Sequence, residues 1–267
     1  MKTYLTLSAI ALAAAATLSS GAMAQTAPAP DFTVTGNFGV TSDYRFRGIS
    51  QNNLDPAFQG GFDVAHKSGV YLGTWGSNVS QWAASTTGSL EMDLYGGYKT
   101  EIAGVAVDIG AISYRYPGSQ KNARSNTDEA YVGLTYGPAV FKTSYVLSKN
   151  YFASTDSGQD ASGTLYFDLT LSQEIAPKLV ASIHAGYTDY ANNAKYTASG
   201  VTPNGKLSYA DYNIGLAYDL GNGFNLAAKY FWNDVNNGTK NWASTGGNDT
   251  GTKLYKDGVA VSLTKAF

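Results

Sequence analysis

The sequence predicts an all-β protein: a transmembrane antiparallel up-and-down β-barrel of about twelve strands that follows a cleaved signal peptide. Polar and apolar residues alternate with a period of two through most of the chain, which is the period of a strand and excludes a helix. Long and short links between these segments also alternate. The chain opens with a secretion leader, which directs it out of the cytoplasm.

The leader occupies residues 1–24. Lys2 precedes an apolar run from Tyr4 to about Leu18, and small residues follow up to Ala24, the order of a secretory signal peptide. We therefore expect a signal peptide at 1–24, a short periplasmic tether at 25–31 and the barrel at 32–267. The chain has no cysteine, so it cannot carry a lipid on cysteine, a disulfide or a thiolate metal site.

Charge argues against a nucleic-acid partner. Removing Lys2 with the leader leaves 17 of the 18 basic residues against 20 acidic ones. A nucleic-acid-binding surface requires clustered positive charge. Thirty glycines and twenty tyrosines instead suit twisted strands whose ends lie at a membrane interface.

The first predicted strand runs from Phe32 to Phe46, with apolar or small residues at even positions and polar residues or glycine at odd positions. This length covers the roughly ten residues that cross a bilayer at a tilt. Eight further segments repeat the pattern. Their outward faces include Phe58 to Val64, Leu90 to Tyr98, Ala130 to Tyr136, Leu165 to Leu171, Leu179 to Tyr187, Ala210 to Tyr218, Phe224 to Trp232 and Val259 to Phe267.

Three more segments, at 70–79, 105–116 and 140–149, are apolar on both faces in places. We count them as strands, which makes twelve, and we expect a bulge near Ala111 where the alternation slips. An even number of strands returns both termini to one side of the membrane, and this side should be the periplasm.

The links support a membrane barrel. Short links fall near 66–69, 99–104, 137–138, 173–178 and 219–223, and long polar links fall near 48–56, 78–88, 117–127, 150–163, 191–206 and 233–254. Outer-membrane barrels have short periplasmic turns and long external loops. All seven prolines lie in the leading segment or in the links, as expected for residues that cannot donate to a closed ladder.

Aromatic residues should form two girdles at the membrane interfaces. On the periplasmic side we expect Phe32, Tyr98, Tyr136, Tyr218, Phe224 and Phe267, and toward the long loops Tyr44, Phe46, Phe58, Tyr187, Tyr230 and Trp232. The alternative is that aromatics occur at these positions because of their strand propensity alone.

Residues 36–51 (GNFGVTSDYRFRGISQ) resemble the opening strand and first loop of the proteobacterial TorF family, whose members are named as porins. Shorter similarities are found at 71–78 (YLGTWGSN), 91–98 (EMDLYGGY), 114–118 (YRYPG) and 129–133 (EAYVG). The resemblance covers essentially the whole mature chain. It implies an outer-membrane barrel more firmly than it implies an activity.

The C-terminal segment resembles the assembly signal of bacterial barrels. Val259, Val261, Leu263 and Phe267 share one face, although Lys265 takes an outward place near the end, from which its amine can reach the interface. The partners expected on this basis are the barrel-assembly machinery, recognising the strand that ends at Phe267, and the outer-membrane lipid and lipopolysaccharide.

The polar face of each strand should line the interior. The predicted pore-lining residues are Asp43, Arg45, Arg47, Asp63, Glu91, Asp93, Glu129, Lys142, Asp168, His184, Asp211 and Lys229, and Lys99 lies on the same face. Charges in a water-filled pore select the solutes that pass, and the slight acidic excess favours cations. The alternative is that these charges pair across a filled interior, since twelve strands lie between packed and channel-forming barrels.

The leading functional hypothesis is a porin-like passive diffusion channel for ions or small hydrophilic solutes across the bacterial outer membrane. The alternative is a non-conducting barrel that acts structurally or binds through its long loops. An outer-membrane enzyme is the third class, but the only histidines are His66, at a turn, and His184, about 7 Å along its strand from Ser182. The sequence contains no cofactor or metal motif.

Overall fold

The computed structural model describes residues 30–80, 88–118, 125–152, 160–191, 208–235 and 254–267. The predicted signal peptide and most of the predicted tether lie outside the described residues. None of the described residues belongs to a helix that is long and apolar enough to cross a membrane.

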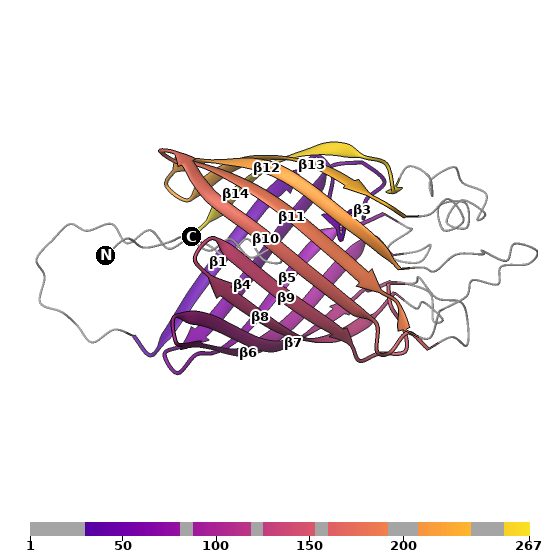
Figure 1. Cartoon of the computed structure of the whole chain (residues 1–267), viewed down its shortest axis with the longest axis horizontal. Coiled ribbons are helices and arrows are strands. Elements are labelled where there is room, and N and C mark those ends of the chain that lie inside the picture. The colour runs from indigo at the N-terminus through magenta and orange to yellow at the C-terminus, as the bar shows by residue number, and fades with distance from the viewer. Residues whose placement is uncertain (1–29, 81–87, 119–124, 153–159, 192–207, 236–253) are drawn as a thin grey trace, which may run out of the picture.

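Twelve strands of the described chain form one closed barrel, as predicted (Figure 1). They are β1 (Phe32–Thr41), β4 (Ala57–His66), β5 (Val70–Asn78), β6 (Leu90–Ile102), β7 (Val105–Arg115), β8 (Thr127–Tyr136), β9 (Ala139–Val146), β10 (Leu165–Ala176), β11 (Leu179–Asp189), β12 (Tyr209–Gly221), β13 (Phe224–Asn233) and β14 (Gly258–Ala266). Each strand pairs antiparallel with its neighbours in the chain, and β1 closes the cylinder against β14. Two short strands, β2 (Arg45–Phe46) and β3 (Ile49–Ser50), pair only with each other.

The two ends of the barrel differ. The short links, such as Ala103–Gly104 between β6 and β7, gather at one end, which we call the turn side. Figure 1 shows the C terminus at this same end. The long links leave the opposite end, the loop side. This arrangement confirms the alternation of link lengths expected from the sequence.

Phe267 extends the seam at which β14 pairs with β1. Its amide donates to the Gly36 carbonyl at 3.0 Å, and its carbonyl accepts from the Gly36 amide at 2.9 Å. Its ring lies so close to Gly36 that an added Cβ would come within 2.6 Å of a ring carbon. A side chain at position 36 would therefore displace the ring that covers this seam.

Apolar side chains cover the outside of the barrel. Exposed examples occur on every strand of the cylinder, among them Val34, Leu72, Ile109, Ile183 and Leu216. So large an apolar surface is unfavourable in water and suits the hydrocarbon of a bilayer. The turn-side girdle of Phe32, Tyr98, Tyr136, Tyr218, Phe224 and Phe267 is exposed on this surface, as predicted.

Two predictions about the strands are wrong. β1 ends at Thr41 instead of Phe46, because the chain then turns into the barrel. The bulge expected near Ala111 does not exist, since β7 keeps a continuous register with both neighbours through this residue. β7 is apolar on both faces because Ile112 and Tyr114 point into a packed interior. The register shifts of the described strands lie beside turns, at Glu174/Ala176 and Asp219/Gly221.

The two faces of one strand allow a matched test of the lipid-facing assignment. Leu216 lies outward on β12 and Ala217 lies inward. We expect Leu216→Arg to lower the free energy of unfolding in lipid vesicles by about 2–4 kcal/mol, because it places a charge in hydrocarbon, and Ala217→Arg to have a much smaller effect. Urea titration of both variants measures this difference. Equal losses would contradict the assignment of the faces.

Candidate functional site

Residues 42–56, between β1 and β4, fold into the barrel, and we call them the plug loop. At its centre β2 and β3 form a short hairpin whose turn consists of two residues, Arg47 and Gly48. These two residues have φ angles of 47° and 77°. Positive φ at both central residues is the signature of a type I′ turn, which matches the twist of the flanking strands. Arg47 at the first of these positions is strained, a condition that persists only where surrounding contacts enforce it.

The hairpin reaches across the whole interior. The Arg47 guanidinium binds Glu129 on β8 with two hydrogen bonds of 2.8 Å, and it lies 4.2 Å from the ring centroid of Tyr166 on β10. In the circular strand order, β8 and β10 are the two neighbours of β9, the strand opposite β1. A loop that starts at β1 and carries a side chain that lies between β8 and β10 therefore reaches across the barrel.

The Arg47–Glu129 pair is almost completely removed from water, with side chains 3% and 0% exposed. The Tyr151 hydroxyl accepts a further bond of 2.6 Å from Arg47. Burial lowers the pKa of the Arg47 guanidinium, but the attraction of Glu129 outweighs it and holds this pKa well above its usual value. Breaking such a buried pair by removing one partner costs about 3–5 kcal/mol.

Other contacts fix the rest of the plug loop. Asp43 forms an ion pair with Arg45 and accepts a hydrogen bond of 2.6 Å from Ser50. The Tyr209 hydroxyl on β12 donates to the Arg47 carbonyl at 2.9 Å. Gly48 lies against β12, where an added Cβ would be 2.6 Å from the Cβ of Asp211. Only glycine combines this close approach with positive φ.

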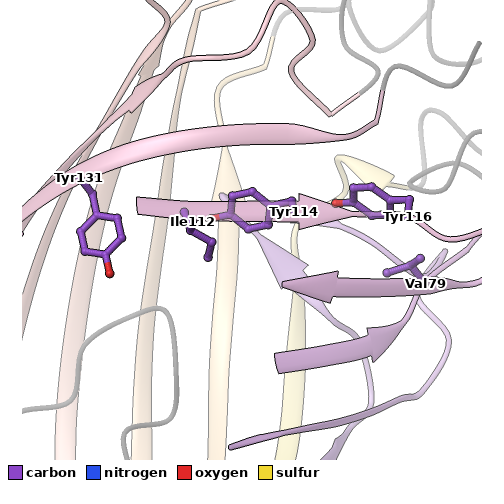
Figure 2. Packing of buried hydrophobic residues seen from close by; sticks show 5 residues of the cluster. All are labelled: Val79, Ile112, Tyr114, Tyr116 and Tyr131. Atoms are coloured by element: carbon purple, nitrogen blue, oxygen red, sulfur yellow. The ribbon is translucent and has the colours of Figure 1, made fainter. Parts of the chain in front are cut away.

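A cluster of tyrosine and aliphatic side chains packs beside the hairpin. Figure 2 shows its buried members: Val79, Ile112, Tyr114, Tyr116 and Tyr131. Tyr44 and Phe46 of the plug loop pack against this cluster, and the Phe46 ring lies 5.7 Å from that of Tyr114 in an edge contact. The prediction that Tyr44 and Phe46 face lipid is therefore wrong, because the chain turns inward after Thr41. Phe58, Tyr187 and Tyr230 are exposed on the outer surface, as predicted.

His184 lies between two carboxylates on the inner face of β10 to β12. Its Nε2 is 3.1 Å from Asp211, and its Nδ1 is 3.4 Å from Asp168. The hydroxyl of Thr170, its cross-strand neighbour, lies 3.1 Å from Nδ1 and also bonds to Asp168 at the same distance. Tyr166 contacts Asp211 at 3.1 Å and joins this group to Arg47. Spacing along one strand does not reveal this contact, because Thr170 lies on the neighbouring strand.

The interior is packed on the loop side and open on the turn side. Inward side chains toward the loops, among them Glu91 and Asp93, are buried, whereas Lys99, Glu101 and Glu174 near the turns are exposed. Small and polar residues such as Ser172 and Ser182 line much of the turn side. Within the described chain, the plug loop and its aromatic contacts therefore fill the loop-side end of the barrel, and the turn-side end is open.

The other predicted residues lie on the inner wall. Asp63 accepts a hydrogen bond of 2.7 Å from Tyr95, and the Lys142 amine lies 3.8 Å from the ring centroid of Tyr131. Lys229 faces the interior from β13, opposite Gly215. Asp43, Arg45 and Arg47 belong to the plug loop and not to the wall. In the described residues, no group of three or more histidine and acidic side chains is placed to hold a metal ion.

Comparison with known proteins places the chain in a family. A family model described as "Bacterial protein of unknown function (Gcw_chp)" matches residues 24–267. The chain belongs to the Gcw_chp family. This match does not establish the TorF name suggested by the sequence motifs. No curated protein matches the chain.

Solved structures share the fold of this Gcw_chp member. The NanC porin has a TM-score of 0.50 at 12% identity, with 88% of this chain and 99% of that chain covered. The KdgM porin has a TM-score of 0.49 at 5% identity, covering 87% and 98%. The outer membrane phospholipase A from Escherichia coli has a TM-score of 0.45 at 13% identity, covering 87% and 91%. At these identities the likeness concerns the fold alone.

Proposed function

We propose that the protein is a porin-like passive diffusion channel for ions or small hydrophilic solutes across the bacterial outer membrane. The observation that carries the proposal is the combination of an apolar outer surface with a polar inner face that is open to water on the turn side. A closed barrel of this kind satisfies its backbone in lipid and leaves its polar side chains for the interior. The TorF resemblance, the NanC-like fold and the predicted secretion leader agree with this proposal.

The plug loop would limit the passage of solutes through the barrel. Because it crosses the interior between β1 and β9, solutes can pass on the loop side only beside it or after it moves. We propose that the predicted inward residues line the path, with the turn side in the periplasm. Lipopolysaccharide would surround the barrel, and the assembly machinery would recognise the strand that ends at Phe267.

A non-conducting barrel is the second candidate, and the filled loop side favours it. Recordings from the purified, washed protein in a planar lipid bilayer separate the two. The channel proposal expects unitary current steps that persist after washing and scale with salt concentration. A silent bilayer, in preparations whose barrel is shown to be folded by β-type circular dichroism, would favour the structural or surface-binding role.

The prediction that the protein is not an enzyme stays a prediction. The Thr170–His184–Asp211 contacts resemble a nucleophile, base and carboxylate in type. However, the Thr170 hydroxyl is shared with Asp168, and all these groups are buried in the barrel wall. Lipase or protease activity that disappears in His184→Ala would revive the enzyme class.

A further inference from the structure

We propose that Glu91 and Asp93 form a binding site for a small inorganic monovalent cation on the loop side of the interior. Both residues point inward from β6 and are buried, with 2% and 3% of their surface exposed. The inference deepens the proposed channel function, on which it rests for its physiological meaning. A cation site beside the plug loop would favour the passage of cations through the narrowest part of the barrel.

Among the carboxylates that are buried in the described interior, charge pairing singles out these two. Asp43 pairs with Arg45, Glu129 pairs with Arg47, and Asp168 and Asp211 share His184. Within the described chain, Glu91 and Asp93 have no cationic partner, and both arginines of the plug loop are already engaged. A buried carboxylate without a counter-charge costs several kcal/mol, so two neighbouring ones require compensation, by a bound cation or by a bound proton.

Unsatisfied oxygen atoms mark the position for such a cation. Asp93 and Tyr114 are direct cross-strand partners on β6 and β7. The Oδ1 atom of Asp93 and the hydroxyl of Tyr114 are both buried, and neither has a hydrogen-bond partner. Tyr114 is only 1% exposed. A buried polar atom is normally satisfied, so these two unpartnered oxygen atoms on neighbouring strands are the ligands that we assign to the cation.

The surroundings favour a monovalent ion over other cations. Glu91 already accepts a hydrogen bond of 3.0 Å from Tyr44 of the plug loop. Calcium sites usually combine several carboxylates, and magnesium, which dehydrates reluctantly, keeps several of its waters. The described residues offer no group of three or more acidic or histidine ligands for either ion. The near-complete burial of Glu91, Asp93 and Tyr114 excludes a bulky organic ammonium ion.

The test measures thermal stability in detergent micelles and does not depend on conduction. Melting of the full-length protein is followed in NaCl or KCl and in N-methylglucamine chloride at the same ionic strength. A ligand that binds only the folded state raises the melting temperature in a saturable manner. We expect this rise with sodium or potassium, its reduction in Asp93→Asn, and its loss in the double variant Glu91→Gln/Asp93→Asn.

The matched control is Glu101→Gln, which removes an exposed inward carboxylate from the turn-side end of the same strand. This variant should keep the cation dependence. Identical melting of the wild type in small and bulky cations would overturn the proposal and indicate that the two carboxylates share a proton. An unchanged dependence in the double variant would place the cation elsewhere. A silent bilayer with intact cation dependence would reject only the channel function.

Discussion

Arg47→Ala is expected to open the loop side of the barrel. The substitution removes both hydrogen bonds to Glu129, the bond to Tyr151 and the stacking on Tyr166. Loss of a buried pair costs about 3–5 kcal/mol, which lowers the ratio of docked to undocked loop by about two orders of magnitude or more. Single-channel recording should therefore show a larger conductance or a higher open probability than in the wild type.

The control for this prediction is Arg115→Ala. Arg115 forms an ion pair of 2.7 Å with Asp128, but both side chains are 41% exposed and outside the interior. Exposed pairs contribute at most about 1 kcal/mol, so this variant should conduct like the wild type. If Arg47→Ala and Arg115→Ala gave the same currents as the unmodified protein, the plug loop would not limit conduction.

Gly48→Val is expected to release the hairpin from β12. A side chain at this position meets Asp211 and must also adopt positive φ. Because Arg45 lies in β2 and Arg47 in the turn of the hairpin, release exposes two trypsin sites. Limited proteolysis in detergent, analysed by mass spectrometry, should give faster cleavage after these arginines than in the wild type.

Gly104→Val supplies the matched comparison. Gly104 has a φ of 81°, similar to the 77° of Gly48, but an added Cβ there would meet nothing within 4 Å. Both variants carry the strain of positive φ, about 1–2 kcal/mol, and only Gly48→Val adds the collision. Rapid cleavage at Arg47 in both variants would show that general destabilisation, and not release of the hairpin from β12, causes the effect.

The sequence was sufficient to predict the barrel, because a two-residue period directly reports which side chains share a face. The short turns between long strands, such as Gly137-Pro138, were equally clear. The plug loop was not recognised because the same alternation continues from Thr41 through Phe46, and a period of two does not reveal where a chain leaves a sheet. The signal that could have indicated it is the Arg47-Gly48 pair before Ile49, which fits a two-residue hairpin.

The sequence predicted which side chains of the candidate site point into the barrel, but not which of them contact one another. Inward residues such as Glu129 and His184 followed from the alternation. The contacts of these residues did not follow, because Glu129 lies 82 positions after Arg47 in the sequence, and no local pattern encodes such a pairing. Ile112 and Tyr114 carried a usable signal, since apolar residues on both faces of a strand indicate a packed interior as well as a lipid-facing surface.

The plug loop is anchored at both of its ends to the paired strands β1 and β4, and it occupies only the loop-side half of the interior. Arg45 is neutralised by Asp43 of the same loop, so an applied voltage would act mainly on Arg47 at the tip of the hairpin, pushing it deeper into the barrel at one polarity and lifting it toward the rim at the other. Such a barrel would behave as a rectifier, with a current that depends on the sign of the potential as well as on its size.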